Sequence, residues 1–351
     1  MPSPRRYPLD PAQCYSAVRY PGGYIPPEVT AIATAKFPRA ALHVNINLDA
    51  CDDFVWTVMR RVRDDFPAGR VVIVEYMNEP WNFGFTGFEY CTKCADYLGY
   101  ENPYSLSYYM RRSAEVGAIA RAAFKETGRE GEIKLMLNCQ LGSDQPQKHL
   151  TYAAKNGWQV DRIGNAPYLM IDTGKDAFAT WDDDQLCDLW PMFLWYDTRA
   201  GSYNGWTATA RGYIADYNKA VGGEGCQLMG YEGGIEYAVP TGSANQVTRG
   251  MDLVYNPHWY WMEDTFYRWA QRHGYANLHV YSLSQYHSPH LWGIYHWPRQ
   301  QPGYGDGRWG GNDNRLRLAR PGQPNSKPAN VNVDLNESVR GQAFRDWLRS
   351  R

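Results

Sequence analysis

The chain has 351 residues, with 36 Lys and Arg against 37 Asp and Glu, and therefore a formal net charge of −1. This balance excludes a strongly electrostatic nucleic-acid binder, and a hydrophobic fraction of 44% excludes a largely disordered chain. Aromatic residues make up 15% of the chain, so we expect part of them to line a surface that stacks on a flat ligand.

No apolar run approaches the ~18 residues that a membrane span needs, so no membrane contact is expected. The first residues, MPSPRRYPLDPAQ, hold two arginines without an apolar run behind them, which argues against a secretory signal. The cellular location stays open, and secretion is the expectation if the sequence is a mature or truncated form.

Residues 1–40 are rich in proline and are predicted to form an irregular N-terminal segment. Strands and helices then alternate along the chain. The predicted strands are 41–48, 71–76, 132–140, 162–170, 227–234 and 277–284. The predicted helices are 54–66, 105–127, 147–157, 184–220 with a break near 200–206, 248–273 and 338–349.

This alternation with about six buried strands predicts a parallel α/β fold. A doubly wound nucleotide binder would carry a glycine-rich phosphate motif between a strand and a helix, and none stands in that setting. We therefore predict a (β/α)₈ TIM-like barrel over residues 41–351, abbreviated or incomplete at its first strands. It would carry a long loop at 298–334 and a C-terminal helix.

The first candidate for chemistry is the segment VVIVEYMNEPWNFGF at 71–85. A buried strand delivers Asn78 and Glu79 to its carboxyl end, where barrels build their active sites, and Pro80 stops the strand. Trp81 flanks the carboxylate and is a candidate for substrate contact. A capping or turn role for Glu79 is the alternative.

The second candidate is QLMGYEGG at 227–234, where a strand again ends in a carboxylate, Glu232. Gly233 and Gly234 would allow a sharp turn or a close backbone approach, and a plain loop role is the alternative. Two carboxylates at one mouth of a barrel match the machinery of glycoside hydrolysis, in which one protonates the leaving oxygen and the other attacks the sugar.

The pair resembles clan A glycoside hydrolases through Asn78-Glu79-Pro80 and Glu232, over residues 41–297. The resemblance implies a (β/α)₈ barrel and a retaining mechanism, with Glu79 as general acid/base after strand 4 and Glu232 as nucleophile after strand 7. It also implies that Asn78 holds the sugar 2-hydroxyl.

The same resemblance implies further substrate contacts. Tyr168 matches a tyrosine beside the nucleophile, and Tyr286 or Trp292 matches the aromatic platform after strand 8. One departure stands out: residues 1–40 are too few for two βα units, which need ~60 or more. The clan's arginine of strand 2 therefore has no counterpart. We expect residues 10–35 to cover the exposed strand edge as a short strand or irregular layer, with self-association as the alternative.

Other features leave alternatives open. Asn47 or Asp49 would reach substrate from the end of strand 41–48, and a turn or helix-cap role is the alternative for Asp49. Cys91 and Cys94 would be a zinc site, a disulfide or redox pair, or two ordinary thiols. Three histidines near 287–296 lack a metal-binding frame, and residues 182–184 are an acidic turn or a calcium site. Neither a metal nor a cofactor is expected.

The sequence thus predicts an endo-acting β-glycanase that cleaves β-linked poly- or oligosaccharides. A catalytically impaired carbohydrate-binding barrel is the alternative. A second rival is a hydrolase with Cys139 as nucleophile, although no histidine is evidently placed beside that cysteine in the sequence. The sugar, the linkage and the oligomeric state are not fixed by these residues.

Overall fold

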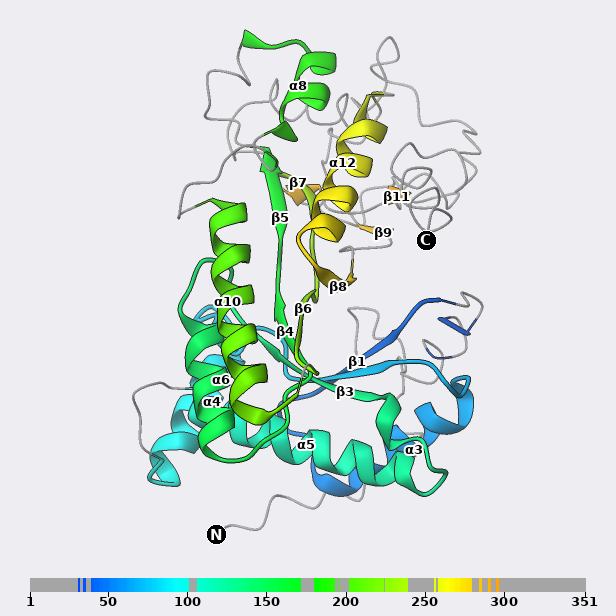
Figure 1. Ribbon diagram of the computed structural model, residues 1–351, viewed down its shortest axis with the longest axis vertical. Coiled ribbons are helices and arrows are strands. Elements are labelled where there is room, and N and C mark those ends of the chain that lie inside the picture. The colour runs from blue at the N-terminus through cyan, green and yellow to red at the C-terminus, as the bar shows by residue number, and fades with distance from the viewer. Residues whose placement is uncertain are drawn as a thin grey trace, which may run out of the picture. The chain divides into compact units, whose positions relative to one another are not determined.

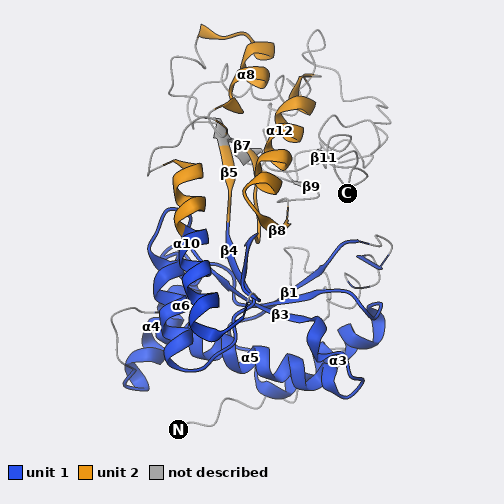
Figure 2. Ribbon diagram, in the orientation of Figure 1, with its two compact units in different colours: residues 1–165, 210–229 blue, residues 166–209, 230–351 orange. Residues whose placement is uncertain are grey.

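The computed structural model describes most of the chain between residues 39 and 279. The described residues are 31, 34–35, 39–100, 106–171, 180–192, 195, 202–223, 225–238, 256, 258–279, 284–285, 290–291 and 295–296. The chain divides into two compact units, coloured blue and orange in Figure 2. The first unit holds residues 1–165 and 210–229, and the second holds residues 166–209 and 230–351.

Helices and strands alternate as the sequence predicts (Figure 1). The described helices are α3 (Asp52–Asp65), α4 (Thr86–Tyr97), α5 (Ser107–Lys125), the 3₁₀ helix η2 (Glu130–Glu132), α6 (Gln145–Lys155), α8 (Asp183–Leu189), α10 (Tyr203–Val221) and α12 (Trp259–Arg272). The described strands are β1 (Leu42–Ile46), β2 (Val72–Tyr76), β3 (Ile133–Asn138), β4 (Arg162–Asn165), β5 (Tyr168–Ile171), β6 (Gln227–Gly230), β7 (Gly234–Ala238), β8 (Tyr275–Leu278), β9 (Ser284–Gln285), β10 (His290–Leu291) and β11 (Tyr295–His296).

The main sheet has six strands in the order β1-β2-β3-β4-β6-β8. Its first four strands pair in parallel, and the sheet curls into a half-barrel. The predicted parallel α/β fold is therefore confirmed. Closure into eight strands stays a prediction.

Helices α3 and α5 cover one face of this sheet within the first unit (Figure 1). Tyr76 of β2 stacks on Tyr109 of α5, with ring centroids 6.2 Å apart, so this side of β2 faces the helices. Strand side chains alternate between the two faces. Glu75 therefore lies on the opposite, concave face of the half-barrel. All five residues of β2 are buried, as its apolar run predicts.

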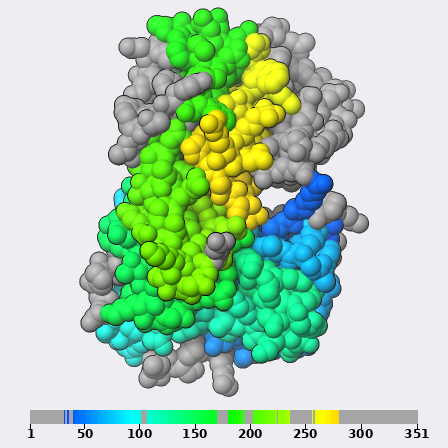
Figure 3. Space-filling model, viewed as in Figure 1, coloured from blue at the N-terminus to red at the C-terminus, as the bar shows by residue number. Residues whose placement is uncertain are grey.

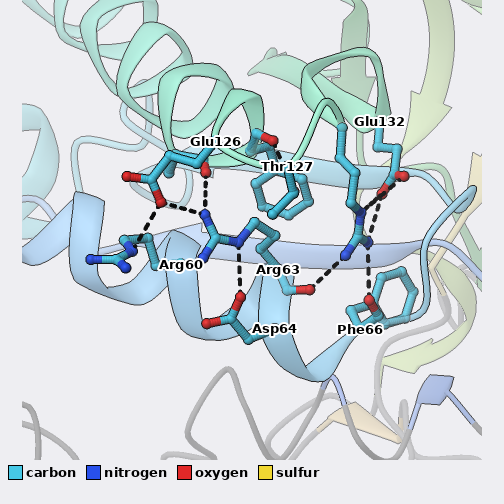
Figure 4. Close-up of polar contacts among 10 residues, drawn as sticks. Arg60, Arg63, Asp64, Phe66, Glu126, Thr127 and Glu132 are labelled. Carbon is cyan, nitrogen blue, oxygen red and sulfur yellow. Dashed lines mark hydrogen bonds and ion pairs between the residues drawn. The ribbon is translucent and has the colours of Figure 1, made fainter.

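A buried arginine, Arg63, and a partly buried one, Arg129, connect the end of α3 to the turn after α5 (Figure 4). Arg63 Nη1 donates to Glu126 Oε2 at 2.6 Å and to the Ala123 carbonyl at 2.7 Å. Arg129 donates to the carbonyls of Arg63 and Phe66, at 2.6 and 3.0 Å. These bonds satisfy carbonyl groups that the end of a helix leaves without a partner.

Three predicted elements differ from the structure. The single strand at 162–170 is two strands, β4 and β5, because Pro167 between them has no N–H to continue a ladder. Strand β5 joins β7 and β10 in a separate three-stranded sheet. The strand predicted at 227–234 ends at Gly230, and Gly234 already begins β7. The strand predicted at 277–284 is β8, which spans Tyr275–Leu278. Helix α4 was not predicted.

The N-terminal segment is described at only a few positions. Ala31, Thr34 and Ala35 have helical backbone, and Arg70 donates to the carbonyls of Thr34, Ala35 and Ala40. These residues therefore contact the turn that precedes β2. Cover of the sheet edge was predicted for residues 10–35, of which the structure describes only these three. The loop at 298–334 and the helix at 338–349 lie outside the described residues.

Candidate functional site

The carboxyl end of β2 is locally strained. Met77 and Glu79 have φ angles of 61° and 45°, in a left-handed region that costs a residue other than glycine about 1–3 kcal/mol. The Met77 amide still donates to the Ile46 carbonyl of β1 at 2.8 Å. Asn82 Nδ2 donates to Glu79 Oε2 at 2.8 Å. The chain thus holds the Glu79 carboxylate in a fixed place at this edge, and the residue is 9% exposed.

Glu75 lies in β2, four residues before Glu79, and is only 2% exposed. Asn45 Nδ2 donates to its Oε2 at 2.7 Å, and Asn138 Nδ2 donates to its Oε1 at 2.6 Å. His43 Nε2 lies 2.9 Å from Oε2. Side chains from β1 and β3 therefore hold this carboxylate on the concave face, and hydrogen bonds offset the cost of burying its charge.

Asn138 links this cluster to the strained strand end. The same Nδ2 that donates to Glu75 also donates to the Met77 carbonyl at 2.9 Å. Its backbone N–H donates to the Tyr109 hydroxyl at 2.9 Å. The side chain is fully buried, and its Oδ1 accepts no hydrogen bond from the part of the chain that the structure describes. Asn138 thus fixes the backbone of Met77, two positions before Glu79.

Sequence reasoning missed Glu75 and Asn138. The segment VVIVEY predicts a continuous buried strand. The glutamate within it indicates a buried carboxylate with polar partners, since glutamate is rarely buried without them. Asn138 lies within the strand predicted at 132–140 and was not predicted as a site residue.

The loop after Glu79 exposes aromatic rings. Phe83 is 88% exposed and Phe85 is 46% exposed, while Trp81 is partly buried. Asn78 is exposed beside Glu79. Large exposed apolar side chains next to polar groups are typical of a ligand-binding surface. Trp81 was predicted to contact substrate, whereas the two phenylalanines were not singled out.

Asn47 follows β1 at the same edge of the sheet and is exposed. Its Oδ1 accepts from the Leu48 amide at 2.8 Å. This bond leaves the side-chain amide nitrogen of Asn47 available for other contacts.

The second unit contains Glu232 and Tyr168. Glu232 follows β6 and is partly exposed, after a buried Tyr231. Gly234 pairs with Tyr168 between β7 and β5. A Cβ on Gly233 would lie 3.0 Å from the Pro167 carbonyl oxygen, so a glycine here leaves room for the neighbouring segment. The structure therefore brings the backbone segments of Tyr168 and Glu232 side by side.

The Cys139 hypothesis needs a correction. His149 of α6 lies beside the thiol, with Nδ1 3.3 Å from Sγ, whereas the sequence showed no histidine there. Both side chains are fully buried. Burial raises the pKa of Cys139 well above its usual value and lowers the pKa of His149 to about 3. Since the thiolate is the nucleophile, this neutral buried pair is structural.

His149 makes stability depend on pH. It is neutral in the folded chain down to about pH 3, whereas an unfolded chain protonates it below about 6.5. Acid therefore favours unfolding: this contribution to the free energy of unfolding is complete above about pH 6.5 and falls by about 1.4 kcal/mol per pH unit towards pH 3. Urea midpoints between pH 4 and 7.5 should show a smaller acid loss in His149→Leu. The same acid loss as in wild type would contradict the assignment. His258→Gln is a control of opposite sign, because the hydrogen bond to Asp188 raises the pKa of His258 and its loss should make the acid loss larger.

Cys91 and Cys94 both carry free thiols in α4. Burial raises the pKa of Cys91 to about 12, which disfavours its thiolate. Within the described ranges, no three His, Cys, Asp or Glu side chains are grouped to hold a metal ion. Tyr286 and Trp292 lie outside the described residues.

Comparison with known proteins adds no relative. No protein-family model matches the chain, and no curated protein matches it. Among the helices that the structure describes, none is long and apolar enough to cross a membrane.

Proposed function

We propose that the chain is a retaining glycoside hydrolase that cleaves β-linked oligo- or polysaccharides, with endo-action as the expected mode. Glu79 is the general acid/base and Glu232 the nucleophile.

The observation that carries the proposal is the position and backbone conformation of Glu79. It follows a strand of a curled parallel sheet, where barrels place their catalytic groups. It also occupies a left-handed backbone conformation. Strain of this kind clusters at functional sites. Glu79 is only 9% exposed, and the hydrogen bond from Asn82 fixes the direction of its carboxyl group.

Glu232 suits the second role. It follows β6 of the main sheet and is less buried than Glu79, so the two carboxyl groups have different surroundings. Two carboxyl groups in different surroundings are what double displacement requires, because one must hold its proton while the other attacks the anomeric carbon.

The neighbours of Glu79 suit a sugar ligand. Asn78 offers an exposed amide for a ring hydroxyl, and the rings of Trp81, Phe83 and Phe85 offer apolar faces. Aromatic side chains with a few polar groups are typical of small-molecule sites.

The proposal is tested by the leaving group that Glu79 must protonate. Glu79→Ala should lower kcat/KM on unactivated β-linked oligosaccharides by about 10²–10⁴-fold. On 2,4-dinitrophenyl β-glycosides the loss should be far smaller, because that leaving group departs without a proton. Initial rates on both substrate classes measure the difference.

Glu89→Ala is the matched control, since Glu89 is an exposed glutamate on α4 that pairs with Lys93. It should leave both rates unchanged. Equal losses of Glu79→Ala on both substrate classes would contradict the acid role.

A second candidate function is a carbohydrate-binding barrel without catalysis, because the residues that the structure describes form a half-barrel of six strands. A wild-type chain that binds oligosaccharides and hydrolyses neither class of substrate would establish it in place of the hydrolase.

A further inference from the structure

A groove of about 640 Å³ lies on the outer side of α5, within the first unit. Its volume is in the range of small-molecule sites. Ala114 and Ala118, one turn apart on α5, line its floor. In Figure 3 the surface of α5 is drawn in teal.

The groove is separate from the candidate active site. Helix α5 packs on the sheet through its other side, where Tyr109 stacks on Tyr76 and Gly117 meets Leu135 of β3. The side chains of Ala114 and Ala118 therefore face away from the concave face that carries Glu75.

Three partly exposed aromatic residues line the groove: Tyr100, Tyr152 of α6, and Trp158. The rings of Tyr152 and Trp158 meet edge to face, with centroids 5.5 Å apart. The Arg111 guanidinium lies 5.2 Å from the centroid of the Tyr100 ring. These contacts fix the rings while leaving part of each exposed, so a ligand would meet preformed apolar faces.

Polar groups complete the lining without giving it a net charge. Arg111 Nε donates to Glu115 Oε1 at 3.0 Å, so the two charges offset each other. Asn156 is exposed, and its Nδ2 donates to the Tyr152 carbonyl at 2.8 Å, which leaves the amide oxygen to accept from a ligand. A phosphate or a nucleic acid would need a basic excess that this groove lacks.

We propose that this groove is a non-catalytic binding site for a neutral oligosaccharide. Sugar rings combine an apolar face, which stacks on aromatic rings, with hydroxyl groups that match mixed donors and acceptors. The neutral ion pair and the exposed amide supply both. The choice of a sugar ligand rests on the proposed function, but binding here needs neither Glu79 nor Glu232.

The test is affinity electrophoresis of the full chain through gels that contain a neutral β-glucan, xylan or mannan. At least one polymer should retard the wild type. Trp158→Ala should weaken that retardation about tenfold or more, as loss of a central aromatic anchor does. Ala118→Lys, a substitution that helices tolerate, should do the same by filling the floor, which guards against misfolding of the first variant.

Trp261→Ala is the matched control, because Trp261 is an exposed tryptophan on α12, 59% exposed, in the other unit. It should keep wild-type retardation. The proposal would be overturned if no neutral polymer retarded the wild type. It would also be overturned if both groove variants were retarded as strongly as the wild type. The two proposals can also be told apart. If the wild type hydrolysed no glycoside but both groove variants lost the retardation, the binding site would be supported and the hydrolase proposal would fail.

Discussion

Replacing Glu232 with alanine is expected to abolish hydrolysis of β-linked substrates, and added azide is expected to restore turnover of activated aryl glycosides. Without the carboxylate no glycosyl-enzyme forms. Azide is small enough to attack the anomeric carbon from the vacated side, and a single displacement inverts the configuration. The expected product is therefore an α-glycosyl azide, identified by proton NMR.

The same reagent separates the two carboxylates. In Glu79→Ala the glycosyl-enzyme still forms from an activated substrate, and azide then releases it by a second displacement. That product is the β-glycosyl azide, with retained configuration. Opposite configurations from the two variants would assign both roles in one experiment.

The control for these assays is Asp184→Asn, which changes an exposed acidic residue of α8 and should keep wild-type rates. Unimpaired hydrolysis by Glu232→Ala would remove Glu232 from the mechanism. An identical configuration of the azide product from both glutamate variants would contradict the division of roles.

Local pattern alone was enough to predict most of the main sheet. The strands β1, β2 and β3 fall within their predicted ranges, because buried parallel strands are short apolar runs between helices. Glu79 and Glu232 were found by the same logic, since each follows such a run. Helix α4 was missed because small residues, Gly87, Cys91 and Ala95, form its buried face and give little hydrophobic periodicity.

The partners of these residues could not be predicted, because they come from distant parts of the chain. Asn138 is 63 residues from Glu75, and only the parallel pairing of β2 with β3 brings them together. His149 reaches Cys139 only after α6 packs back against β3. The break at Pro167 was visible in the sequence, but the separate sheet that β5 joins depends on pairing with β7.

The largest effect on stability is expected from Glu75, which lies at the centre of the polar cluster on the concave face. Glu75→Ala removes the acceptor for Asn45 and Asn138 and the partner of His43. Breaking a buried charged group away from its partners costs about 3–5 kcal/mol, so the free energy of unfolding should fall by that amount. Glu75→Gln keeps one acceptor oxygen and should cost about 1–3 kcal/mol. Urea midpoints at a constant slope measure both losses.

Glu89→Ala is the control here as well, because exposed substitutions stay within about 0.5 kcal/mol. A loss in Glu75→Ala no larger than in the control would show that the cluster contributes little to folding.

Asn138→Ala should also destabilise the chain, since it removes the hydrogen bonds to both Glu75 and the Met77 carbonyl. The double variant combines Glu75→Ala with Asn138→Ala. Because one Asn138 amide donates to both groups, its loss of free energy of unfolding should be smaller than the sum of the single losses, with a coupling of about 0.5–3 kcal/mol. Additive losses would mean that Glu75 and the strained end of β2 are held independently. Non-additive losses would tie the buried carboxylate to the backbone conformation that presents Glu79.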